Sequence, residues 1–385
     1  MPASLRCVPA LLALSLLAAC SDEPDPRPVL TDPLPFEAPE PVQIAVTQHT
    51  GEVCKSIDQL QESIGGFLDE PAAGALQQAR AHWVRTHHTY SGLMVAYQLA
   101  NLRPPHVQGD RDPIDAYPLL PGYLDRVPGY PRSGLVYSEV PLTPGYLQQE
   151  HQSTDFYYLT LGFHPLETLL WGGIDQRPEY RTELFIPAPV AQEDTVDARA
   201  RRRELLRLIA HALPRDASIL CVHSNRLELM HSLSERLGEP SSQRQAVAEA
   251  LTVLIDRPLA EWQSHPDGVD RNGMSIWHAM FAKTDFERMA MQLQALRTDW
   301  LPASPASDES APDASGGLFD SMAALETTLA SMGETRTAPS PEAVSQARAM
   351  TQTLIARLQN ADGQGPALPE PEPLTPAPTS EKAGQ

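Results

Sequence analysis

The sequence is poor in positive charge and in cysteine, and it has no apolar segment long enough to cross a membrane. Lys and Arg number 29 against 49 Asp and Glu, which gives a formal net charge of -20. An acidic chain repels polyanions, so this balance argues against nucleic acid or an anionic lipid surface as a partner. Metal cations and basic protein surfaces are still compatible with this charge as partners, although most of these carboxylates serve solubility alone.

Common catalytic motifs are also missing. The chain contains no His-Glu-x-x-His pair, which the helix of many zinc peptidases carries, and no Gly-x-Ser-x-Gly nucleophile elbow. Of the four cysteines, Cys7 lies in a predicted export signal and Cys20 is the predicted lipidation site. Cys54 and Cys221 are left as a disulfide or as two buried thiols, and their separation along the chain does not decide between these alternatives.

The export signal occupies the first residues. Arg6 supplies a positive charge, and the apolar run 8–19 is too short to span a bilayer. It ends in Leu17-Ala18-Ala19-Cys20, the pattern of a lipobox, after which comes Ser21 rather than an aspartate. We therefore expect residues 1–19 to be removed, Cys20 to carry a lipid anchor in the membrane, and the protein to face the periplasm from the outer membrane.

Two polar, proline-rich stretches flank the part of the chain that can fold. Residues 20–42 form a lipidated tether and 362–385 a tail, since neither composition can bury a core. Between them we predict an all-α fold of two helical bundles packed side by side, 43–195 and 196–361. The first bundle includes a long ordered loop.

Apolar residues recur at helical spacing through this region, as Leu60, Ile64 and Phe67 do, and strand-type alternation is nearly absent. The predicted helices include the ranges 74–99, 198–213, 217–237, 242–262, 275–296, 317–332 and 341–358. Proline and glycine predict loops at 103–143 and 301–315. The first loop carries four tyrosines that either tie it to the core or serve function: Tyr117, Tyr123, Tyr130 and Tyr137.

The most informative motif is Gly162-Phe163-His164-Pro165-Leu166-Glu167, in which His164 and Glu167 share one helix face. An imidazole and a carboxylate on successive turns can bind one cation. The alternative is that the motif only starts a helix and binds no metal, because Pro165 suits the first turn and Glu167 favours the positive end of the helix dipole.

This motif, continued by Leu-Leu-Trp171-Gly, resembles the signature of the imelysin-like family. Ile114-Asp115-Ala116-Tyr117-Pro118-Leu119 resembles a family loop that has tryptophan in place of Tyr117, and Phe286-Glu287-Arg288-Met289 resembles a late family helix. The similar blocks bracket about residues 81–291. The resemblance implies two helical bundles, a periplasmic or surface location and association with iron uptake.

The chain departs from the family pattern in one helix, where the family has Trp, Arg, Tyr and Glu. Here the series reads Trp83, His87, Tyr90 and Met94, so the acidic residue that the resemblance implies for the family's site is lost. Either His87 or the adjacent His88 replaces that ligand, or the site has become a structural or partner-binding pocket. His82, on another face of the helix, cannot join them.

We therefore expect a divalent metal, iron or zinc, at His164, Glu167, His87 and Asp115, with no catalytic residues. His223 and His231 have no acidic partner at metal spacing and are interpreted as structural. The expected role is metal binding in iron uptake, with an envelope protein as a possible partner. The alternatives are a scaffold that binds an envelope protein without metal and, with less support, an imelysin-type metallopeptidase.

Overall fold

The computed structural model describes residues 38–120, 122–127, 131–172, 177–187, 196–302 and 312–360. The predicted signal, the lipidated Cys20, most of the tether, Tyr130 and the predicted tail lie outside these residues. From Ala38 onward the chain forms one unit. Within the described residues all regular secondary structure is helical, which confirms the all-α prediction.

The longest helices, α1 (Glu40–Asp69) and α2 (Ala73–Ala100), form an adjacent pair joined by a three-residue turn. The apolar face of α1 is buried at helical spacing through Val42, Val46, Val53, Ile57, Leu60, Ile64 and Phe67. Helix α2 ends at Asn101, which takes the left-handed conformation common at helix C-termini (φ 52°).

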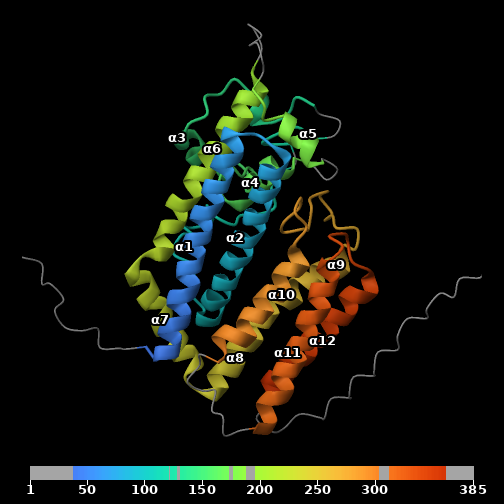
Figure 1. The fold of residues 1–385 in the computed structure, drawn as a ribbon. Helices are drawn as coiled ribbons and strands as arrows, with labels where there is room; N and C mark the ends of the chain where they lie inside the picture. Colours follow the sequence, from blue (N-terminus) through green and yellow to red (C-terminus); the bar gives the residue numbers. More distant parts are fainter. Residues whose placement is uncertain are drawn as a thin grey trace, which may run out of the picture. The chain divides into compact units, whose positions relative to one another are not determined.

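Helices α6 (Ala198–Ala217) and α7 (His223–Leu237) pack against α1, and α7 also contacts α2 (Figure 1). Where one helix was expected over 217–237, a short 3-10 turn, η2 (Ser218–Cys221), comes first and α7 begins only at His223. By the predicted division both helices fall in the second half of the chain, but their packing joins them to α1.

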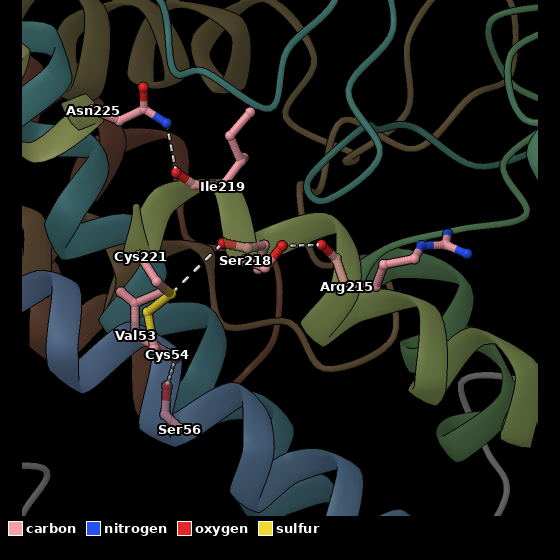
Figure 2. The surroundings of a disulfide bond; sticks show 9 residues. Val53, Cys54, Ser56, Arg215, Ser218, Ile219, Cys221 and Asn225 are labelled. Atoms are coloured by element: carbon pink, nitrogen blue, oxygen red, sulfur yellow. Dashed lines mark hydrogen bonds between the residues drawn. A yellow bond between two sulfur atoms is a disulfide. The ribbon is translucent and has the colours of Figure 1, made fainter. Parts of the chain in front are cut away.

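A disulfide joins Cys54 on α1 to Cys221 in η2, with a Cα–Cα distance of 6.6 Å (Figure 2). The structure thus decides between the two alternatives left by the sequence. Ser218 Oγ donates to Arg215 O (2.6 Å) and Asn225 Nδ2 donates to Ile219 O (2.7 Å), so the turn between α6 and α7 is held on both sides. The bridge fastens this turn to the middle of α1.

A second group comprises α8 (Pro240–Leu251), α9 (Arg257–Ser264), α10 (Asp285–Ala295), α11 (Pro312–Gly333) and α12 (Pro341–Asn360). Helix α12 packs on α8, α9 and α11, and α10 packs on α11 and α2 (Figure 1). Five-residue π-helical segments continue α8 and α10, namely η3 (Thr252–Asp256) and η4 (Leu296–Trp300). Helix α2 contacts α1, α7, α8 and α10, and therefore lies between the two groups.

The helix predicted over 275–296 is wrong in its first half, since α10 begins at Asp285 and 265–284 is a loop. Asp285 explains why the helix begins there. Its carboxylate accepts the N–H groups of His278 (2.7 Å) and Ala279 (2.9 Å), which folds the preceding segment back onto the start of α10. Trp277 anchors the loop against Trp262 on α9, with ring centroids 4.8 Å apart.

The described residues of the stretch predicted as a long loop, 103–143, contain no α-helix and include a 3-10 turn, η1 (Leu135–Tyr137). Three short helices follow it: α3 (Pro144–Glu150), α4 (Phe163–Trp171) and α5 (Pro178–Glu183). The second predicted loop, 301–315, is shorter than expected because α11 begins at Pro312. Among the described helices none is both long and apolar enough to cross a membrane.

Candidate metal centre

Gly162, just before α4, decides how the long loop meets that helix. Its φ is 91°, and a Cβ at this position would overlap the carbonyl oxygen of Ile114. Because no side chain intervenes, the Phe163 N–H donates to Ile114 O at 2.8 Å. Glycine therefore allows the loop backbone to lie on the start of α4 and brings Asp115 next to His164.

Asp112 shapes the same loop. Its Oδ1 accepts the N–H groups of Ile114 (2.8 Å) and Asp115 (3.0 Å), and its carbonyl oxygen accepts His151 Nε2 (2.9 Å). The other ring nitrogen of His151 accepts the Leu161 N–H at 3.2 Å. The Asp115 backbone is thus held by its own turn and by a histidine that bridges it to the segment before α4.

Three imidazoles converge on the carboxylate of Asp115. Its Oδ1 lies 3.0 Å from Nε2 of His87 on α2, 3.2 Å from Nε2 of His164 on α4, and 3.1 Å from Nε2 of His278 in the 265–284 loop. One ligand atom from each of the four residues lies within 4.8 Å of all the others. The three imidazoles are buried, and the Asp115 side chain is 16% exposed.

These separations suit a metal ion. Ligand atoms bound at 2.0–2.2 Å in tetrahedral or octahedral geometry lie about 2.9–3.5 Å from their neighbours. The three nitrogen-to-oxygen distances fall in that range, and each of the four residues comes from a different segment. The arrangement can hold one cation with three nitrogen ligands and one carboxylate.

The protonation states of the metal-free cluster follow from burial and from these contacts. Burial disfavours a charged His164, but hydrogen bonds with Asp115 and Glu167 outweigh it and raise the His164 pKa to about 9. Burial also raises the pKa of Asp115, yet the attraction of His278 and His87 holds it well below its usual range. Burial depresses the pKa of His278, against the attraction of Asp115.

Glu167 lies behind His164 rather than in the convergent group. Its Oε2 is 3.1 Å from His164 Nδ1, and its Oε1 accepts the N–H groups of Phe281 and Ala282, both at 2.7 Å. Both oxygens are thus engaged. Glu167, predicted as a direct ligand, is not one of the four residues that could hold a metal ion; its contacts orient the His164 ring and fasten the loop that carries His278 to α4.

A protein-family model described as imelysin matches residues 45–364. The chain belongs to the imelysin family. The match covers most of the chain and confirms the resemblance inferred from the motif around His164. A search of curated proteins gives no match.

Aromatic residues of this imelysin enclose the cluster. Trp83 stacks on His87 (ring centroids 4.8 Å apart) and donates its indole N–H to Phe163 O at 2.8 Å. Trp171 of the family motif packs edge-on against Trp83. Tyr117 lies on the other side, with its ring centroid 3.9 Å from that of His278, and is 51% exposed. Tyr117 therefore separates His278 from solvent.

The structure separates the histidines singled out in the sequence into those in the cluster and those outside it. His87 faces the cluster, whereas His82 and His88 lie outside it, as do His223 and His231. Met94, which stands in place of the family's acidic residue, packs against the core. His278 is the fourth member of the group that could hold a metal ion.

Sequence reasoning missed His278 because it assigned this residue to a helix. The signal that could have revealed it is Asp285 directly before an apolar helical repeat, which marks a helix start and leaves 275–284 free to form a loop. Arg288, singled out in the late motif, lies one turn into α10, where its charge disfavours protonation of His278.

Proposed function

We propose that this imelysin binds one divalent transition-metal ion, iron or zinc, through His87, Asp115, His164 and His278. The observation that carries the proposal is the convergence of three Nε2 atoms on one carboxylate oxygen at 3.0–3.2 Å. Imidazole and carboxylate ligands suit both metals, whereas Mg²⁺ and Ca²⁺ prefer sets made of oxygen alone.

Charge balance supports a cation at this position. Asp115 and Glu167 both approach His164, and Glu167 is fully buried. Without a metal, a proton on His164 supplies the compensating charge. With a metal, His164 keeps its Nδ1 proton for Glu167 and offers the lone pair of Nε2 to the ion. Metal uptake therefore exchanges a proton for a divalent cation in a buried, acidic environment.

We place this activity in the cell envelope, as an exported and lipid-anchored protein that takes part in iron uptake. Family membership and the metal-binding arrangement support this role, and the Cys54–Cys221 disulfide is typical of an oxidising compartment. An envelope protein that delivers or receives the ion is the partner this role requires. The metal is then cargo rather than a catalytic cofactor.

Metal-dependent peptide cleavage has less support. Such a reaction needs a general base close to the metal-bound water. Glu167 is the carboxylate nearest to His164 apart from Asp115, and both of its oxygens already accept hydrogen bonds. We therefore propose binding without catalysis at this site.

Metal analysis of the purified protein tests the proposal. After exposure to Fe²⁺ or Zn²⁺ and dialysis, we expect about one ion per chain in the parent and little in His278→Ala or Asp115→Asn. His82→Ala is the matched control, since it removes a histidine from α2 outside the cluster. Metal-free parent protein, with normal folding, would contradict metal binding and favour the scaffold alternative.

A further inference from the structure

The four residues of the cluster differ in how far solvent reaches them. The side chains of His87, His164 and His278 are at most 8% exposed, whereas the Asp115 side chain is 16% exposed. A hydrated ion exchanges its waters for protein ligands as it binds, so it has to arrive from the side that solvent reaches. That side is the one beside Asp115.

Among the described residues, packed side chains close the other sides of the cluster. Trp83 stacks on His87, and Phe163 packs edge-on against the same ring with the centroids 5.2 Å apart. Glu167 lies behind His164. A small space that adjoins the cluster has no room for a water molecule, and its lining includes Pro118, Leu119, Trp277 and Met280. An ion could pass these sides only if the core opened.

Tyr117 lies over the side beside Asp115. It follows Asp115 by two residues in the same loop, and its ring centroid is 3.9 Å from that of His278 and 6.1 Å from that of His164. Tyr117 is also half-exposed, so part of the residue contacts the imidazoles while the rest faces solvent. Its ring therefore lies between the cluster and the solvent.

Ring contacts, rather than hydrogen bonds, hold the Tyr117 side chain in place. Its hydroxyl makes no hydrogen bond with any described residue. The backbone on either side is fixed, because Asp112 Oδ1 accepts the Asp115 N–H and the Leu120 N–H donates to Tyr157 O, both at 3.0 Å. Rotation of the side chain can thus remove the ring from the cluster while Asp115 stays in place. An aromatic contact favours the closed position by a factor of about 2–12.

We propose that the Tyr117 ring is a removable cover that controls access from solvent to the four-residue cluster. The identity of the ion that passes rests on the proposed function, whereas the cover is a property of the metal-free protein. Exposed side chains change rotamer within nanoseconds, so the ring opens and closes many times before an ion arrives. Entry and release are therefore slowed by the same factor, and the affinity is unchanged.

Stopped-flow kinetics with Zn²⁺ measure this effect on the purified protein. Tryptophan fluorescence follows entry, with Trp83 beside His87 as the reporter, and transfer of the ion to excess EDTA follows release. In Tyr117→Ala we expect both rate constants to rise about three- to tenfold, because the closed position no longer exists. The dissociation constant should equal that of the parent protein.

Two variants serve as controls for these rate constants. Tyr117→Phe keeps the ring and removes only a hydroxyl that has no described partner, so it should behave as the parent does. Tyr180→Ala removes another exposed tyrosine, from α5 and outside the cluster, and should also leave both rate constants unchanged.

Labelling of the metal-free protein separates this inference from metal binding. Diethyl pyrocarbonate acylates accessible imidazoles, and mass spectrometry of the peptides identifies the modified histidine. We expect His278 to react about threefold faster or more in Tyr117→Ala than in the parent, and at the parent rate in Tyr117→Phe. His231, an exposed histidine on α7, is the internal reference and should react equally in all three proteins.

Three results would overturn the proposal. Unchanged Zn²⁺ rate constants in Tyr117→Ala, or unchanged labelling of His278, would show that the ring does not control access. Equal acceleration in Tyr117→Phe would assign the effect to the hydroxyl. Faster release alone, with weaker affinity, would show that Tyr117 stabilises the bound ion. If the parent binds no Zn²⁺, the proposed function fails, and the labelling of His278 still decides whether Tyr117 is a cover.

Discussion

Replacing Gly162 by alanine should damage the fold and the metal centre together. The added Cβ would overlap Ile114 O and crowd the Pro113 carbonyl, while the residue would still have to adopt a φ of 91°. Holding a non-glycine residue in such a conformation costs about 1–3 kcal/mol. Losing the hydrogen bond from Phe163 N–H to Ile114 O adds about 1 kcal/mol. We therefore expect Gly162→Ala to lower the free energy of unfolding by about 2–4 kcal/mol.

The same substitution moves the 113–115 backbone away from α4, so the distance between Asp115 and His164 should increase and metal affinity should fall. Urea unfolding followed by tryptophan fluorescence measures the first effect, and metal titration measures the second. Gly51→Ala is the matched control. Gly51 lies in α1, and a Cβ added there would have no neighbouring atom within 4 Å, so alanine should stabilise the helix by up to about 1 kcal/mol. Parent-like stability and metal affinity in Gly162→Ala would refute the role assigned to the glycine.

Further predictions concern the stability of the fold. Cys54→Ser should lower the free energy of unfolding by about 2–5 kcal/mol in denaturant titrations, because the bridge to Cys221 closes a long loop. A denaturant midpoint equal to that of the parent in non-reducing buffer would contradict this. Asp125 forms buried ion pairs with Arg181 and Arg202, so Asp125→Asn, which leaves both guanidinium groups without their carboxylate, should lower the free energy of unfolding by about 3–5 kcal/mol. A loss below about 1 kcal/mol would argue against these ion pairs. Although burial raises the pKa of Asp125, Arg181 and its neighbour Arg202 hold it well below the usual range, so its stabilisation is present above about pH 4 and is lost as pH falls further. Burial lowers the pKa of His151, so the unfolded chain takes up this proton first and stability should decline as pH falls from about 7 to 5; the decline should be smaller in His151→Gln.

Periodicity and motif spacing predicted much of the fold. Apolar residues such as Leu60, Ile64 and Phe67 indicated α1 correctly, because a helix that buries one face must repeat its apolar residues every three or four positions. The packing partners of α6 did not follow from that pattern. An amphipathic helix specifies which of its faces is buried but not which helix covers that face, and α6 packs on α1.

The candidate site was predicted in part for a similar reason. His164 and Asp115 were identified from local motifs, and the structure brings them together with His87. His278 was missed because its position depends on contacts distant in sequence, the hydrogen bonds from its loop to Glu167 and Asp285. Spacing alone indicated Glu167 as a ligand, but only the folded chain shows that both of its oxygens are already bonded.

The disulfide illustrates the same limit. Cys54 and Cys221 are far apart in the sequence, and nothing in their local surroundings indicates that α1 passes the turn between α6 and α7. Their pairing is a consequence of helix packing. It can be inferred only after the neighbours of α1 are known.

X-ray absorption spectroscopy of the metal-loaded protein tests the central claim most directly, because it reports the ligands around the ion. We predict nitrogen and oxygen ligands at about 2.0–2.2 Å with outer-shell scattering from three imidazoles, reduced to two in His278→Ala. A spectrum with no imidazole scattering, or one that His278→Ala leaves unchanged, would contradict a metal centre built from His87, Asp115, His164 and His278.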